Sequence, residues 1–158
     1  MVKGRHEQEA EAALRAIKKG VIARLGRKAL SDEDISIEGH RCFGRRWQGV
    51  FRQSQWPGAE PNRFAVLNTA TSPTTPGSHW VACYTSPSGT TYLWDSFGRN
   101  TNALLHAATQ KVVTSGAGRV VGSDRDAQQR GSSEVCGQLC IAWLLLVRDQ
   151  GTRVARLV

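Results

Sequence analysis

The pattern of apolar and polar positions predicts an N-terminal helix over residues 7–29. Its apolar side chains recur at helical spacing and form one stripe, made of Ala10, Leu14, Ile17, Val21 and Leu25. Acidic residues come early and basic residues late, which suits the helix dipole. A second helix is expected from Ser31, where Ser31-Asp32-Glu33-Asp34 has a capping-box pattern, to about Gly39. We therefore expect residues 1–30 to form an amphipathic basic arm and residues 31–158 to form the main domain.

The middle of the chain predicts β structure. Residues 80–84 and 90–94 alternate or run apolar, and a short Ser/Pro/Gly turn between them predicts an antiparallel hairpin. The expected strands cover 63–68, 80–84, 90–94 and 118–122, and a further helix is expected over 102–113. Together with the flanking helices, this pattern predicts an α+β fold with a mixed central sheet.

The most apolar stretch predicts a buried helix that begins at Cys136 and runs to about Val147. The start of a helix carries partial positive charge and free backbone N–H groups, and a cysteine placed there has its pKa lowered. The commoner role for such a cysteine is a buried structural one. Cys83 and Cys140 are expected to be of that structural kind.

Charge and composition restrict the partners. The 158 residues carry a net charge of +8 and a pI near 9.9, which favours an anionic partner such as nucleic acid, or simply a solvated basic surface. Arginines interleaved with aromatics between Arg41 and Trp56 leave the same two alternatives. The longest apolar run is too short to span a bilayer, and no signal-peptide pattern is present. Four cysteines suggest free thiols in a reducing, intracellular compartment.

A candidate nucleophilic site arises from the hairpin and the buried helix. His79 precedes the first hairpin strand and Asp95 follows the second, so an antiparallel pairing brings them to the same edge of the sheet. A carboxylate beside an imidazole fixes its tautomer and stabilises its protonated form. With Cys136, the parts of a Cys–His–Asp site are present. Zinc binding through Cys136, Cys140 and His79, or through His40 and Cys42, lacks the usual ligand spacing, and we expect no metal.

Three motifs in order resemble the adenain-like cysteine peptidases, the family of the adenoviral maturation protease, within the wider Ulp/SENP-like group. They are Gly77-Ser78-His79-Trp80-Val81-Ala82, then Tyr92-Leu93-Trp94-Asp95-Ser96-Phe97-Gly98, then the run from Gln128 to Gly137 that contains Cys136-Gly137. The segment from Ala65 to Ala70 is also similar. The resemblance covers about residues 43–148.

This resemblance implies a role for each matching residue. Cys136 would be the nucleophile, His79 the general base and acid, and Asp95 the orienting carboxylate. Gln129 would complete an oxyanion hole with the Cys136 backbone N–H, and Gln128 competes for that assignment. It also implies that Trp80 lines the substrate channel and that Gly137 permits close approach of backbone at the helix start.

The implied function is a cysteine endopeptidase that cleaves after small residues in Gly-X-Gly or Gly-Gly contexts, processing viral or transposon capsid precursors in the virion and host cell nucleus. A monomer with non-specific DNA affinity and no membrane association is expected. Two alternatives stay open: a deubiquitinase- or deSUMOylase-like isopeptidase, and a non-catalytic basic nucleic-acid-binding domain with the same fold.

The chain departs from the family pattern in two places. Residues 112–127 contain no cysteine, so the family's disulfide-linked activating peptide is not expected. No cofactor is therefore required, although DNA or a peptide could still activate the protein. The added helix at 7–29 is expected to pack against the sheet and to replace the activating peptide in cis.

Overall fold

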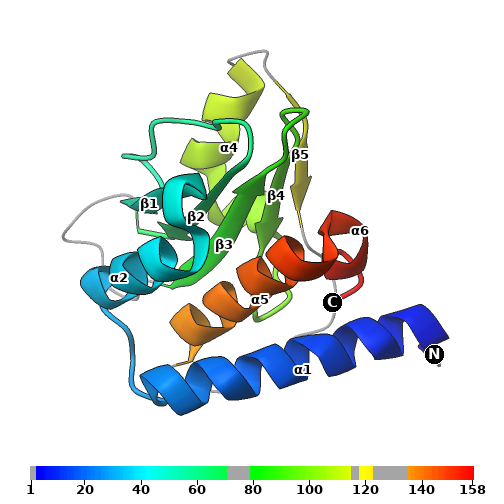
Figure 1. Ribbon diagram of the computed structural model, residues 1–158. Coiled ribbons are helices and arrows are strands. Elements are labelled where there is room, and N and C mark those ends of the chain that lie inside the picture. Colours follow the sequence, from blue (N-terminus) through cyan, green and yellow to red (C-terminus); the bar gives the residue numbers. More distant parts are fainter. Residues whose placement is uncertain (1–2, 71–78, 115–117, 123–134) are drawn as a thin grey trace.

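The computed structural model describes residues 3–70, 79–114, 118–122 and 135–158. It is an α+β arrangement in which helices flank a five-stranded mixed sheet of order β1-β2-β3-β4-β5 (Figure 1). The strands are β1 (Trp47–Arg52), β2 (Arg63–Asn68), β3 (Trp80–Thr85), β4 (Thr91–Trp94) and β5 (Val120–Gly122). The two outer pairs, β1 with β2 and β4 with β5, are parallel, and the inner pairs are antiparallel.

Helices cover both faces of this sheet. The helical elements are α1 (Arg5–Leu25), α2 (Asp32–Phe43), the 3₁₀ turn η1 (Gly44–Arg46), α3 (Thr101–Leu104), α4 (His106–Thr114), α5 (Cys136–Gln150) and α6 (Thr152–Ala155). Side chains that alternate along the strands divide the interior into two cores. Phe64 and Val66 of β2 face a core shared with α1, α2 and α5, while Ala65 and Leu67 face a smaller core under α4.

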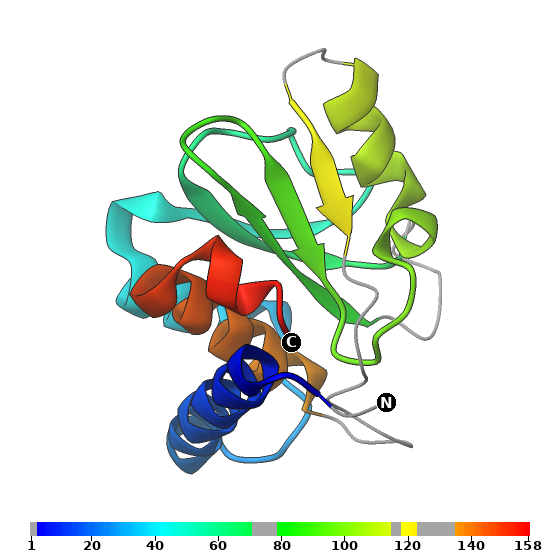
Figure 2. The same ribbon diagram turned by 90° about the vertical axis from the view of Figure 1, so that its right-hand side faces the viewer.

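Helix α5 lies at the centre of the larger core. Every residue from Gly137 to Val147 is buried, and a helix that is apolar on all sides needs neighbours on all sides. The sheet covers one side of α5 and α1 covers the opposite side (Figure 2). The expectation that the N-terminal helix packs against the sheet is therefore wrong: α1 packs on α5 and α6, and its buried residues Ala10, Leu14 and Val21 belong to the larger core.

Other elements also differ from the sequence-based expectation, and α1 itself spans Arg5–Leu25 rather than 7–29. The helix expected to end at Gly39 continues to Phe43. Gly39 lies inside it against the indole of Trp47, where a Cβ atom would come within 2.1 Å of Cε2, so this glycine permits close packing and does not end the helix. Strand β1 was not expected from its sequence. The helix expected over 102–113 is two helices, interrupted at the fully buried Leu105. The capping box at Ser31, the antiparallel hairpin and the start of α5 at Cys136 are confirmed.

None of the helices in the described part of the chain has both the length and the apolar character needed to cross a membrane.

Candidate active site

The β3–β4 hairpin brings His79 and Asp95 together. Ala82 pairs with Trp94 at the open end of the hairpin, so the residue just before β3 lies near the residue just after β4. His79 Nε2 is hydrogen-bonded to Asp95 Oδ1. The main chain of His79 is held by Thr69, the residue after β2, since the His79 N–H donates to Thr69 Oγ1 at 3.2 Å and the His79 carbonyl accepts from Thr69 N at 2.9 Å. The juxtaposition expected from the hairpin is confirmed.

Asp95 is a fully buried carboxylate with several donors. Burial alone would raise its pKa, but the hydrogen bonds from His79 and Arg99 outweigh that effect and bring the pKa of Asp95 to about 2. The carboxyl is therefore ionised at neutral pH and can only accept hydrogen bonds. It follows that His79 Nε2 carries a proton and that Nδ1 is the ring nitrogen free to exchange a proton with another group.

That other group is the Cys136 thiol, the first side chain of α5. Burial acts to raise the pKa of Cys136, but the hydrogen bond with His79 and the N–H groups of Trp80 and Gly137 lower it overall. For His79, burial acts to lower the pKa, while the hydrogen bonds to Asp95 and Cys136 raise it overall. Opposite shifts of this kind favour a thiolate–imidazolium pair.

The other buried thiols behave in the opposite way. Burial raises the pKa of Cys83 to about 12, and burial together with the charges of Cys136 and Asp95 raises the pKa of Cys140 well above its usual value. Cys140 lies one helical turn below Cys136 on α5. The two thiols lie on the same helix, but the pKa of Cys136 is lowered and that of Cys140 is raised, as expected for a structural Cys140.

Residues 26–31, which connect α1 to α2, pack against the start of α5. Gly137 faces Leu30, since a Cβ atom on Gly137 would lie 3.2 Å from Leu30 Cβ. Trp80, which follows His79, is partly buried and donates its indole N–H to Leu30 O at 3.3 Å. Both residues expected at the site thus contact this connection, while a substrate-lining role for Trp80 remains a prediction.

Sequence reasoning missed two residues of this region. Gln138 is fully buried, and its side-chain N–H₂ donates to Gly26 O at 3.0 Å and to Lys28 O at 2.7 Å. Its position was noticeable as a polar side chain among the apolar residues of α5. Arg99 binds Asp95, and no pattern in the sequence pointed to it.

Gln129 and its competitor Gln128 lie outside the described residues, so the oxyanion assignment remains a prediction. One donor for an oxyanion is available in the described part. The backbone N–H of Cys136 is among the first of α5, and such groups have no acceptor within the helix. The helix dipole adds partial positive charge at the same place.

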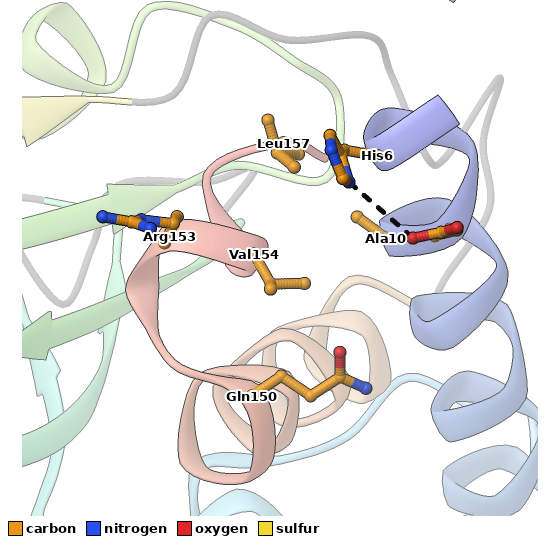
Figure 3. A pocket seen from close by; sticks show the side chains of 7 residues that line it. His6, Ala10, Gln150, Arg153, Val154 and Leu157 are labelled. Atoms are coloured by element: carbon orange, nitrogen blue, oxygen red, sulfur yellow. Dashed lines mark ion pairs between the residues drawn. The ribbon is translucent and has the colours of Figure 1, made fainter. Parts of the chain in front are cut away.

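A pocket of about 470 Å³ lies at the opposite end of α5, between the start of α1 and α6 (Figure 3). It is lined by His6, Glu9, Ala10, Gln150, Arg153, Val154 and Leu157. The 15 residues of α5 place it about 22 Å from Cys136, so it does not belong to the candidate site. Among the described residues, no three His, Cys, Asp or Glu side chains gather where they could hold a metal ion.

A scan against models of protein families and a search of curated proteins returned no match to this chain. The geometry of the Asp95–His79–Cys136 site is accordingly the observation on which a function can be proposed.

Proposed function

We propose that this chain is a cysteine endopeptidase with an adenain-like fold and site. One observation carries the proposal: Asp95, His79 and Cys136 form a continuous chain of contacts that ends in a thiol at a helix N-terminus. The α+β arrangement with a mixed sheet, and a buried helix that begins with the nucleophile, supports the same proposal.

The geometry suggests a mechanism in which one proton moves between His79 and the reacting groups. In the proposed resting site, the raised pKa of His79 and the lowered pKa of Cys136 favour a proton on His79 Nδ1 next to a Cys136 thiolate. The sulfur bonds to the carbonyl carbon of the scissile peptide, and His79 Nδ1–H then donates its proton to the departing amine. A water molecule attacks the acyl carbon while His79 accepts its proton, and the C–S bond then breaks, which releases the acid product and restores the Cys136 thiolate beside the protonated His79. Asp95 stays ionised throughout and holds Nε2–H in place.

The oxyanion formed in each step needs donors that are already in place. The Cys136 backbone N–H supplies one, and Gln129, or Gln128 in its stead, is proposed to supply the second. Losing one such donor typically costs about 2.7–4 kcal/mol of transition-state stabilisation. Gln129→Ala and Gln128→Ala should therefore separate the two assignments, because only one of them should lower kcat by about 10²-fold or more.

The proposed substrates are capsid precursors of a virus or transposon, cleaved after Gly in Gly-X-Gly or Gly-Gly contexts. The test is a panel of Gly-X-Gly-Gly peptides beside ubiquitin and SUMO fusions, incubated with the full chain and with Cys136→Ala. Cleavage of the short peptides only by the wild type supports an endopeptidase. Preference for the folded fusions supports the isopeptidase instead, and equal results with Cys136→Ala exclude both.

The net charge of +8 supports a proposed affinity for DNA, in the virion or nucleus, that could guide the enzyme along packaged nucleic acid. Binding should weaken steeply with salt, because each phosphate contact releases a counterion. DNA binding together with an unreactive Cys136 would favour the non-catalytic alternative.

The arm at 1–30 is proposed to activate the site in cis through its connection to α2 rather than through the sheet. Gln138 holds the connection by two hydrogen bonds, and Leu30 contacts Gly137 and Trp80, the neighbours of Cys136 and His79. Gln138→Met keeps the length of the side chain but removes both bonds. We expect it to lower kcat more than KM, and an unchanged kcat in a folded Gln138→Met protein would exclude this role.

A further inference from the structure

A tight turn after β4 surrounds the Asp95 carboxylate. Gly98 has a φ of +70°, a left-handed conformation that glycine adopts without strain, and its N–H donates to Asp95 O at 2.9 Å. The turn directs the N–H of Phe97 to Asp95 Oδ1 at 3.3 Å and the N–H of Arg99 to Oδ2 at 3.2 Å. Each carboxylate oxygen therefore has a backbone donor of its own, as in other anion-binding turns.

The side chain of Arg99 returns to the same carboxylate. Its Nε lies 2.9 Å from Asp95 Oδ2, the oxygen that does not contact His79. Its guanidinium lies 5.0 Å from the centroid of the Phe97 ring, and that ring lies 5.1 Å from the His79 ring. Asp95 is thus held between His79 on one oxygen and Arg99 on the other, with Phe97 beside both.

Arg99 is not part of the packed interior. Its side chain is 46% exposed, whereas that of Asp95 is fully buried. A half-exposed residue whose guanidinium lies over Phe97 and meets a buried carboxylate can be changed without opening a cavity. Removing Arg99 takes away one partner of the Asp95 carboxylate, so its effect on His79 is measured on variants shown to be folded.

We infer that Arg99 is a positioning residue of the proposed peptidase site. It fixes the rotation of the Asp95 carboxylate and shares that charge with His79, and it thereby sets the pH range over which His79 stays protonated. The catalytic consequence rests on the proposed function, but the effect on His79 does not.

The direction of the effect follows from the charges around His79. In the described part of the chain, the titratable groups facing His79 and Asp95 include Arg99 on the turn, and Cys136 and Cys140 on α5. Removing the Arg99 charge leaves the full charge of Asp95 acting on the imidazolium. His79 then holds its proton more strongly, and its pKa rises.

The experiment follows the His79 imidazole by NMR as a function of pH in the full chain, with the signal identified by its loss in His79→Gln. The variants are Arg99→Met, which keeps an unbranched side chain without the charge, Arg99→Lys, which keeps the charge but lacks Nε–H, and Arg153→Met. Arg153 is an exposed arginine of α6, so this control makes the same change in net charge far from the site.

We expect the His79 midpoint to rise by ~0.5–1 pH unit in Arg99→Met, because a half-exposed ion pair is partly screened. The rise should be smaller in Arg99→Lys and absent in Arg153→Met. The basic limb of the kcat/KM profile should move by the same amount, and Arg99→Lys should lower kcat more than it changes KM.

An unchanged or lowered midpoint in a folded Arg99→Met protein overturns the inference, as does an equal rise in Arg153→Met. If Arg99→Met does not fold, Arg99→Lys decides, since loss of the Nε–H contact alone should still move the midpoint upward and an unmoved midpoint contradicts the inference. If the wild type cleaves no peptide at all, the proposed function fails, but the titration of His79 still decides the role of Arg99.

Discussion

Two clusters in this molecule combine a buried carboxylate, arginine and cysteine, and they affect the cysteine in opposite ways. In the first cluster, His79 stands between Asp95 and Cys136, and the pKa of Cys136 is lowered. In the second, Glu38 of α2 meets the thiol of Cys42 directly, with Cys42 Sγ 3.4 Å from Glu38 Oε1. There, burial and then the Glu38 carboxylate raise the pKa of Cys42.

The difference shows what the histidine contributes. A carboxylate beside a thiol opposes its ionisation, because both groups would then be negative. An imidazole placed between them accepts the proton of the thiol and presents a positive charge to the sulfur. The second cluster instead joins α1 to α2, since Arg24 Nη2 lies 2.6 Å from Glu38 Oε1 and Arg41 binds the same oxygen. The first cluster is therefore the one to which the proposed function assigns catalysis, and the second links two helices.

The largest expected effect comes from removing the thiol of each cluster in turn. Cys136→Ala should lower kcat for a cleaved peptide by at least ~10³-fold, because the proposed acyl-enzyme forms on the Cys136 sulfur. Cys42→Ala should leave kcat within about twofold of the wild type. Comparable losses in the two variants would contradict the assignment of roles.

Replacing the carboxylate of each cluster should also have different effects on kcat/KM. Asp95→Asn should lower kcat/KM by ~10²-fold or more, since an amide no longer stabilises the imidazolium or fixes its tautomer. Glu38→Gln is the matched control and should change kcat/KM by less than about threefold. Activity assays at pH 7 on the folded variants measure both values.

The reactivity of the two thiols can be compared without a substrate. At pH 6, iodoacetamide should modify Cys136 at least ~10-fold faster than Cys42, because only the thiolate reacts and only Cys136 has a lowered pKa. Mass spectrometry of the digested protein assigns the adducts. His79→Ala should remove the faster modification of Cys136. Equal modification rates of Cys136 and Cys42 in the wild type would contradict the proposed enzyme function.

The free energy of unfolding should depend on the second cluster, although the activity does not. Glu38→Gln should lower the free energy of unfolding by about 1–2 kcal/mol, since two arginines lose a buried charged acceptor while remaining half-exposed themselves. Denaturant titration measures the change. A fall in kcat/KM of more than about threefold in the folded Glu38→Gln protein would instead place Glu38 in the candidate site.

The smallest effect is a shared loss of stability in acid. The pKa of Asp95 is lowered from 3.8 to about 2, and that of Glu38 is also lowered. Carboxyls with a lowered pKa stabilise the folded state above their unfolded pKa, and this contribution is lost as the pH falls from about 4 toward 2. Thermal melts over that range should show a decline, which should be about 1 kcal/mol shallower in Asp95→Asn. A parallel decline in both proteins would mean that Asp95 contributes nothing.

Local pattern was enough to predict much of the fold. Helical spacing located α1, a capping box located the start of α2, and a short turn paired β3 with β4. The juxtaposition of His79 with Asp95 followed from that pairing alone, because an antiparallel hairpin fixes which ends meet.

What escaped prediction depends on contacts between distant segments. The glycine at position 39 inside α2 is explained by Trp47 of β1, whose indole occupies the space that a side chain would fill. The packing of α1 on α5 depends on how much of α5 the sheet leaves uncovered. Arg99 could not be identified, because an arginine after a glycine turn is usually a solvated surface residue.

The complete burial of α5 from Gly137 to Val147 has a consequence for exchange of backbone hydrogens with solvent. Amides in the second half of such a helix should exchange only when the whole protein unfolds, whereas loop amides exchange through small local openings. Cys136 is attached to this slowest-exchanging element. In the proposed peptidase, the nucleophilic sulfur would thus be attached to an element that stays rigid for as long as the protein is folded.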